Sequence, residues 1–209
     1  KMFNNYIGER NRFDIFATPL VVENNIYSLN SKELKFIKSR SLKKIDNNSI
    51  SKDALVIENK ELLKLRKKID SCVNNYVKND LFINDKVTRT QSWIAVNKKG
   101  ESHHQHDHPN TFISAIFYVN CDSGDLILTK SVSPIQEGFN FNYSIIKHSN
   151  ANTRKWIVPV KTGDLVIFPG HITHHSTTNE NYEDRVILGV NYFIKGILGT
   201  SDNVDLIKI

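Results

Sequence analysis

Apolar and polar residues alternate in short runs along the second half of the chain. From about residue 85 these runs are rich in Val, Ile, Thr, Tyr and Phe and are separated by residues typical of turns, which predicts successive β-strands. Parallel neighbours would need long crossover connections, so we expect antiparallel pairing in a jelly-roll-like unit. The predicted strands are Thr88–Val96, Thr111–Cys121, Leu126–Ser131, Lys155–Val160, Asp164–Phe168, His174–Thr178 and Arg185–Ile194.

The first half of the chain has a different periodicity. An opening strand is predicted at Ile15–Glu23, and Ser31 is interpreted as the N-cap of a short helix that ends near Ser39. The Asn-, Ser- and Asp-rich segment that follows predicts a mobile loop. From Asn59 onward, apolar residues recur at steps of three and four, which is typical of an amphipathic helix that covers a sheet. These apolar positions are Leu62, Leu65, Ile69, Val73 and Tyr76.

Length and composition add a domain count to this picture. A chain of 209 residues with 39% hydrophobic residues can bury one sizeable core. We therefore expect a single domain over residues 1–209, mainly β with flanking helices. A helical region at about 24–84 would support a jelly-roll core at about 85–195.

Charge and cysteine content indicate which binding partners and which cellular compartment to expect. The net charge of +6 favours anionic partners, but the lysines are scattered along the chain, so nucleic acid is not favoured as a partner, although it is not excluded. Cys72 and Cys121 do not form a CxxC pair or a dense framework, which is typical of reduced structural thiols. No apolar run is long enough to span a membrane. We expect a soluble, cytoplasmic protein.

Two clusters hold most of the histidines, HHQHDHP at 103–109 and HITHH at 171–175. Both clusters lie at the edges of predicted strands. Residues two apart in a strand face the same side, so His106 and His108 can direct both imidazoles at one point while Asp107 faces away, with His104 further out toward the loop. An antiparallel jelly roll can bring a third ligand from the second cluster. The alternative is a solvated loop that binds metal only adventitiously.

A cationic residue follows the second cluster. Arg185 opens the apolar strand RVILGVNYF after an Asn-rich loop, and a guanidinium can bind a carboxylate through two parallel hydrogen bonds. The alternative for Arg185 is a surface ion pair with Glu183 or Asp184. The residues expected on one face of this strand are Arg185, Ile187, Gly189 and Asn191.

These segments resemble a known family. The stretches Ser92–Val119, Gly163–Asn179 and RVILGVNYF are similar to the 2-oxoglutarate- and iron(II)-dependent oxygenases common in marine bacteria and their phages. The shared pattern is a Trp, then HxHPxS before a strand, then GDLxxFP, a distal His followed by Asn, and an arginine-led strand. The resemblance runs from about Ile15 to Phe193 and covers nearly the whole chain.

The resemblance implies a fold, an activity and a set of site residues. The fold is the double-stranded β-helix, the cupin-like jelly roll. The implied activity is that of a dioxygenase that uses Fe(II) and 2-oxoglutarate, hydroxylates a substrate, and releases succinate and CO2. His106, His108 and His174 would be the metal ligands, and Arg185 would bind the distal carboxylate of 2-oxoglutarate. Further family positions expected at the pocket are Ser92, Trp93, Asn110, Ser114, Tyr118 and Asn191, of which we assign Tyr118, Ser114, Asn110 and Asn191 to the cosubstrate.

Two departures keep other functions open. The broader superfamily has HxD or HxE where this chain has HxH, and the family's Ser after the arginine is Ile187 here. A neutral triad suits iron(II), zinc or copper. One alternative is a three-histidine cupin-type metalloenzyme that does not use 2-oxoglutarate. Another is a non-catalytic jelly-roll protein, a binding or virion-associated protein, in which the metal is structural. The sequence singles out no primary substrate and no oligomeric state.

Overall fold

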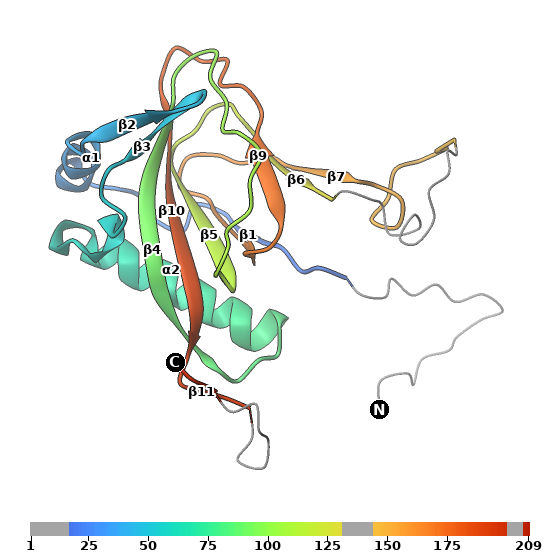
Figure 1. Cartoon of the computed structure of the whole chain (residues 1–209). Coiled ribbons are helices and arrows are strands. Elements are labelled where there is room, and N and C mark those ends of the chain that lie inside the picture. The colour runs from blue at the N-terminus through green and yellow to red at the C-terminus, as the bar shows by residue number, and fades with distance from the viewer. Residues whose placement is uncertain (1–16, 131–143, 200–206) are drawn as a thin grey trace.

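The larger of two facing sheets forms the centre of the molecule (Figure 1). The structure is a computed structural model that describes residues 17–130, 144–199 and 207–209. The large sheet has seven strands in the order β1-β8-β5-β10-β4-β3-β2, and every pair is antiparallel. Its strands are β1 (Val21–Glu23), β2 (Leu42–Ile45), β3 (Asn48–Ser51), β4 (Lys86–Asn97), β5 (Ile113–Asn120), β8 (Leu165–Pro169) and β10 (Arg185–Lys195).

The smaller sheet has three strands in the order β7-β6-β9, namely β7 (Lys155–Val158), β6 (Leu126–Thr129) and β9 (Thr173–Ser176). In its register Leu128 lies opposite His174 on one side and Trp156 on the other. An apolar cluster that includes Leu126, Tyr118 and Phe168 joins residues of both sheets. The architecture is thus the expected mainly β jelly roll, with the two sheets facing each other.

Helix α2 (Leu63–Asn75) covers the opposite face of the large sheet (Figure 1). It follows two 3₁₀ turns, η1 (Val56–Glu58) and η2 (Lys60–Leu62), and continues into a π-helical turn, η3 (Tyr76–Asp80). Every apolar position of the predicted pattern is buried: Leu62, Leu65, Ile69, Val73 and Tyr76. At about 2 kcal/mol each, burying these side chains contributes on the order of 10 kcal/mol before entropy is counted. The helix therefore stabilises the large sheet by packing on the face opposite the smaller sheet.

Helix α1 (Ser31–Lys38) begins one residue earlier than the sequence indicated. Its N-cap is Asn30, not Ser31: the Asn30 side chain accepts hydrogen bonds from the backbone amides of Lys32 and Glu33. The Glu33 carboxylate in turn accepts from the Asn30 amide, which completes a capping box. Asn30 outcompetes Ser31 because only Asn30 stands three residues before the glutamate.

The segment predicted as a mobile loop is a β-hairpin, so that prediction is wrong. Strands β2 and β3 pair from Leu42↔Ser51 to Ile45↔Asn48, and Asp46 at the turn has a φ of 42°. Strand β3 then pairs with β4, which adds the hairpin to the large sheet. This pairing with β4 is the reason why the polar segment forms strands, and it buries Asn48 fully.

The other predicted strands are confirmed with shifted ends. The opening strand is reduced to β1, and Ile15 lies outside the described residues, as does Ser131 at the end of the predicted third strand. Two short strands near the C-terminus, β11 (Ile197–Leu198) and β12 (Ile207–Lys208), pair with each other.

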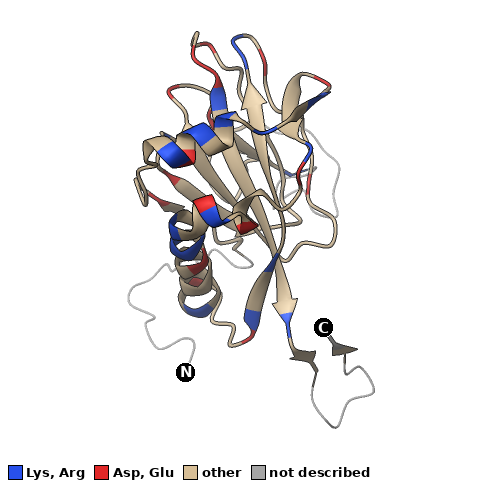
Figure 2. Cartoon of the chain, turned by 90° about the vertical axis from the view of Figure 1, so that its left-hand side faces the viewer, with Lys and Arg blue, Asp and Glu red and all other residues tan. Residues whose placement is uncertain are grey.

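Charged residues lie mainly on the helices and loops, and the central strands are largely uncharged (Figure 2). None of the described helices is long and apolar enough to cross a membrane.

Candidate metal centre

The segment that carries the first histidine cluster is fixed to the edge of β9. His106 and His174 form an antiparallel bridge through two backbone hydrogen bonds, His106 N to His174 O at 3.0 Å and the reverse at 2.8 Å. The amide of His108 donates to Gly170 O at 3.1 Å. His106 and His108 therefore lie in an extended segment with a single bridge, not in a full strand, but the predicted alternation holds.

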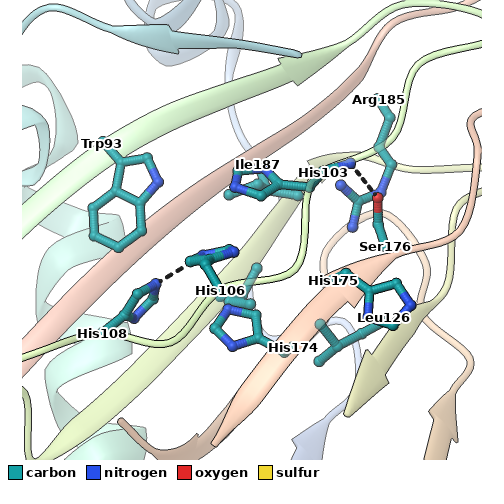
Figure 3. A pocket seen from close by; sticks show the side chains of 11 residues that line it. Trp93, His103, His106, His108, Leu126, His174, His175, Ser176, Arg185 and Ile187 are labelled. Carbon is teal, nitrogen blue, oxygen red and sulfur yellow. Dashed lines mark hydrogen bonds between the residues drawn. The ribbon is translucent and has the colours of Figure 1, made fainter. Parts of the chain in front are cut away.

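Three imidazoles meet at one point (Figure 3). The ring centroids are 4.4 Å apart for His106 and His174, 5.0 Å for His106 and His108, and 5.0 Å for His108 and His174. One ring nitrogen from each lies within 4.8 Å of the other two. The sequence-predicted triad is therefore brought together from two segments more than sixty residues apart.

The hydrogen bonds of these rings show which nitrogens are free to bind. His106 Nδ1 lies 2.9 Å from the carbonyl oxygen of His104, and His174 Nδ1 lies 2.9 Å from that of Ile172. A carbonyl only accepts, so in both rings Nδ1 carries the proton and Nε2 keeps its lone pair. The Nε2 atoms of His106 and His108 are 3.1 Å apart. Two nitrogens bound to one metal at about 2.1 Å with a right angle between them lie about 3.0 Å apart, so the rings fit a shared ion.

His108 is positioned by two buried side chains. Its Nδ1 lies 2.6 Å from Ser114 Oγ, and the Ser114 hydroxyl donates to Asn191 Oδ1 at 3.0 Å. Asn191 Nδ2 reaches Gln91 Oε1 at 3.4 Å. Because the serine proton is used toward Asn191, Ser114 Oγ accepts from His108 Nδ1, and the Nε2 of His108 is left free for a metal.

Burial keeps the imidazoles neutral. Desolvation, together with the neighbouring His106, lowers the pKa of His174 to about 3 and that of His108 to about 4. Desolvation also lowers the pKa of His106. Neutral rings bind a metal without first losing a proton, so the triad is ready to bind a metal at neutral pH.

The triad opens into a cavity that reaches Arg185 (Figure 3). Arg185 is buried, with 4% of its surface exposed; Nε donates to Gly124 O at 2.9 Å and Nη1 to Asn97 Oδ1 at 3.2 Å. The surface ion pair with Glu183 or Asp184 is not formed, so that alternative is wrong for the described residues. The cavity is lined by Trp93, His103, His106, His108, Ile116, Leu126, His174, His175, Ser176, Arg185 and Ile187.

A tyrosine lies beside the arginine. Tyr118 is fully buried, its ring centroid is 5.3 Å from the guanidinium carbon of Arg185, and its hydroxyl has no hydrogen-bond partner within the described part of the chain. Burial raises the pKa of Tyr118, so the hydroxyl keeps its proton. Tyr118 does not itself line the cavity, but its unpartnered donor lies beside the buried cation that would bind a carboxylate there.

The remaining sequence-predicted residues lie in several places. Trp93 lines the cavity and meets His108 edge-on, with ring centroids 5.1 Å apart. Ser92 is on the opposite face of β4, where its hydroxyl accepts from the Ile57 amide at 2.9 Å. Phe112 packs against the core under α2. Asn110 is exposed at a positive φ of 57° in the turn before β5.

His103 is one of the cavity residues that were not assigned from the sequence. His103 lines the cavity between the triad and Arg185, and its Nδ1 lies 2.7 Å from Asn48 Nδ2. Burial lowers the pKa of His103 to about 2. Its place depends on the β2–β3 hairpin, which sequence reasoning had taken for a loop, so no local signal marked it.

Comparison with known proteins indicates a family. Residues 91–191 match the family model described as "Putative 2OG-Fe(II) oxygenase". The match covers just under half of the chain and indicates similarity to the 2OG-Fe(II) oxygenases. The matched segment includes both histidine clusters and Arg185. Among curated proteins, no sequence matches this chain.

Solved structures agree on the fold. An oxidoreductase of the 2OG-Fe(II) oxygenase family from Burkholderia pseudomallei is 9% identical, with a TM-score of 0.58 and 83% of each chain covered. HygX from Streptomyces hygroscopicus, with nickel and 2-oxoglutarate bound, is 10% identical, with a TM-score of 0.57 over 84% of this chain and 82% of that one. A prolyl hydroxylase from Trichoplax adhaerens is 15% identical, with a TM-score of 0.56 and 83% of each chain covered. At these identities the likeness concerns the fold.

The family match and the histidine triad fit an enzyme that uses iron(II) and 2-oxoglutarate. The triad provides three nitrogens that fit a metal. Iron(II) bound with 2-oxoglutarate supplies the oxidative decarboxylation of the cosubstrate and the hydroxylation of a second substrate, with release of succinate and CO2.

Proposed function

We propose that His106, His108 and His174 hold the iron of this oxygenase through their Nε2 atoms, and that Arg185 and Tyr118 bind the far carboxylate of 2-oxoglutarate. One observation carries the proposal: the three lone pairs and the buried guanidinium face one cavity from opposite ends. A dicarboxylate keto acid needs a metal at its keto-acid end and a cationic fork at the other.

The charges of the cavity support a dianionic cosubstrate. Among the described lining residues Arg185 is the single fixed charge, since the histidines are neutral and no carboxylate is present. A divalent ion would raise the total to +3. Because the usual carboxylate ligand is replaced by His108, this site has one more positive charge to balance, and 2-oxoglutarate brings two negative ones.

Other side chains would control solvent and orientation. Trp93, Ile116, Leu126 and Ile187 give the cavity an apolar lining. Such a lining limits water around the carboxylate and strengthens the ion pair with Arg185. Ser114 and Asn191, assigned to the cosubstrate from the sequence, contact His108 instead, and we propose that they orient this ligand; direct cosubstrate contacts of Ser114, Asn191 and Asn110 stay a prediction.

The test is an anaerobic titration of the iron(II)-loaded protein with 2-oxoglutarate. Chelation of the keto acid to iron(II) produces a weak visible charge-transfer band, which we expect in the wild type. Arg185→Ala should weaken 2-oxoglutarate binding at least about 10-fold, since it removes a buried charge-assisted pair. Arg154→Ala, at an exposed arginine outside the cavity, is the control and should leave the titration unchanged.

The variants separate the rival functions. Arg185→Lys keeps the charge but loses the planar fork, so it should bind 2-oxoglutarate with intermediate affinity. A wild type that binds iron but gives no band would favour a three-histidine metalloenzyme that does not use 2-oxoglutarate. A protein whose metal cannot be reached by any added ligand would favour a structural site. Circular dichroism of each variant checks that the fold is kept.

Three broader expectations extend the proposal. The apolar core that joins α2 to the large sheet supports a single domain, in which residues 24–84 serve the jelly roll. The motifs in Ser92–Val119 and Gly163–Asn179 support the type of oxygenase found in marine bacteria and their phages. The composition supports a cytoplasmic location. Limited proteolysis that leaves one resistant fragment would support the first of these.

A further inference from the structure

A second group of three histidines adjoins the metal centre and shares one ring with it. One ring nitrogen from each of His103, His104 and His106 lies within 4.8 Å of the other two. The ring centroids are 5.1 Å apart for His103 and His104, 4.7 Å for His103 and His106, and 5.1 Å for His104 and His106. The sequence HHQH supplies all three from four consecutive positions.

One ring nitrogen of this group is buried without a hydrogen-bond partner, which ring stacking alone does not explain. His104 Nδ1 is inaccessible to solvent and has no hydrogen-bond partner within the described residues, and the nearest carboxylate, Asp46 Oδ2, is 3.9 Å away. The unpartnered Nδ1 of His104 and the Nε2 lone pair of His106 are therefore both available to an ion. A cation between them would satisfy these lone pairs.

The β2–β3 hairpin supports the group from outside. Asn48 is fully buried and contacts His103 Nδ1 at 2.7 Å, and Asp46 lies at the turn of the same hairpin. Asn48 Oδ1 has no partner within the described residues, so rotation of this amide by 180° would let Oδ1 accept from His103 Nδ1 and free Nε2 for a metal. The side chain of Asp46 is 74% exposed, so it can also move toward a bound ion.

His106 cannot serve both groups at once. Its Nδ1 is held by the His104 carbonyl, which leaves Nε2 as the single nitrogen available to a metal. A neutral imidazole binds one ion through that atom. Occupation of one group therefore removes a ligand from the other.

We propose that His103, His104 and His106 form an alternative site for a divalent transition metal and compete with the metal centre for His106. Imidazole ligands suit zinc, nickel and copper, and copper binds more tightly than iron(II) at any such site. An ion held in the alternative site would leave His108 and His174 without their third ligand. The inference rests on the proposed function only in the role of His106 at the metal centre.

The test is Zn²⁺ binding to the metal-free protein, followed by isothermal titration calorimetry and native mass spectrometry. His108→Ala/His174→Ala removes the metal centre and should still bind one Zn²⁺ tightly. His103→Ala/His104→Ala removes the alternative site and should also bind one. Adding His106→Ala to either variant should weaken binding at least about 10-fold, since loss of a ligand costs no less than loss of an outer partner.

A matched control gives the opposite result if the proposal is wrong. His108→Ala/His174→Ala/His104→Ala keeps two histidines of the alternative group. If it binds Zn²⁺ as tightly as the parent double variant, or if the parent binds none, the alternative site does not exist. Wild type that binds two Zn²⁺ ions tightly at once would contradict the competition. None of these measurements uses 2-oxoglutarate, so they stand or fall separately from the Arg185 titration.

Discussion

Gly124 lies directly against Arg185. A Cβ atom at Gly124 would be 2.6 Å from Arg185 Cδ and 2.9 Å from Nε, and the Gly124 carbonyl accepts the hydrogen bond from that same Nε. The backbone φ of +93° also requires glycine. The guanidinium is therefore positioned by a residue that has no side chain.

Gly124→Ala should displace Arg185 and weaken 2-oxoglutarate binding by about 10-fold, or about 1.4 kcal/mol, with iron(II) affinity kept. Gly100→Ala is the matched control, because Gly100 also has a positive φ, of +82°, but its Cβ would meet no atom within 4 Å. Both variants carry similar backbone strain. Equal loss of 2-oxoglutarate affinity in both would contradict a specific role of the Gly124 contact.

Ser114→Ala should weaken metal binding. It removes the acceptor that fixes His108 Nδ1, and loss of such an outer partner typically costs 10- to 100-fold in metal affinity, so we expect at least about 10-fold. Ser92→Ala is the control: Ser92 is equally buried in the large sheet, but its hydroxyl binds the Ile57 amide. Calorimetric titration with Co²⁺ should show a change for Ser114→Ala alone, whereas thermal unfolding should report both.

Metal and 2-oxoglutarate should bind with strong positive coupling. The described cavity lining has no carboxylate, so the positive charges of the ion and Arg185 repel each other. Binding of the 2-oxoglutarate dianion neutralises this repulsion. We expect Mn²⁺ affinity to rise by about 10-fold or more with saturating 2-oxoglutarate, and 2-oxoglutarate affinity to rise by the same factor with Mn²⁺. Succinate, which lacks the keto group, serves as the control ligand. Independent binding of the two would argue against a shared cavity.

Trp93 should report occupation of the metal centre. It meets His108 edge-on, whereas Trp156, the other tryptophan of the chain, is 52% exposed on β7. In Trp156→Phe, added Co²⁺ should quench most of the remaining emission, because the ion would bind beside Trp93. Trp93→Phe should show far less quenching. The His108→Ala form of Trp156→Phe should lose the effect if the ion binds where proposed.

The ion pairs around Arg89 should give a pH-dependent stability. Its guanidinium contacts Glu58 and Asp70, and the hydrogen bond from Arg89 lowers the pKa of Glu58. A depressed carboxyl pKa stabilises the fold above the ordinary value of about 4.3, and this contribution is lost as the pH falls through the folded-state pKa. The Glu58 side chain is 39% exposed, so we expect no more than about 1 kcal/mol.

Urea unfolding of wild type and Glu58→Gln between pH 3 and pH 7 measures this contribution. The difference in the free energy of unfolding should be largest near neutral pH and vanish toward pH 3. Exposed Glu61 provides the control variant Glu61→Gln. A difference that grows as the pH falls would contradict the assignment.

The strands and two histidines of the triad could be predicted because their signals are local. Alternating residues such as those of Arg185–Lys195 fix which side chains share a face, and the two-residue spacing of His106 and His108 gives a common direction even in an extended segment with one bridge. The jelly-roll arrangement then follows from antiparallel pairing. The spacing gave His106 and His108, whereas His174 was selected from the second cluster by the family resemblance.

The missed features depend on contacts between distant segments. Asp46 lies at the turn of the β2–β3 hairpin, but both strands are polar and β2 is largely exposed, so the pairing of β3 with β4 is what stabilises the hairpin. His103 enters the cavity because Asn48 of that hairpin holds its ring. Ser114 and Asn191 lie behind His108 and not at the cavity surface, which depends on the pairing of β5 with β10 at this position.

Two of the three proposed ligand rings are oriented by hydrogen bonds to the main chain. His106 and His174 each bond the carbonyl two residues earlier, a contact that survives any change in neighbouring side chains. Of the three rings, His108 alone is oriented by a side chain, through the hydrogen bond between its Nδ1 and the Ser114 hydroxyl. A side-chain substitution at position 114 can therefore change the orientation of His108. The orientations of His106 and His174 are set by backbone carbonyls, which no substitution removes.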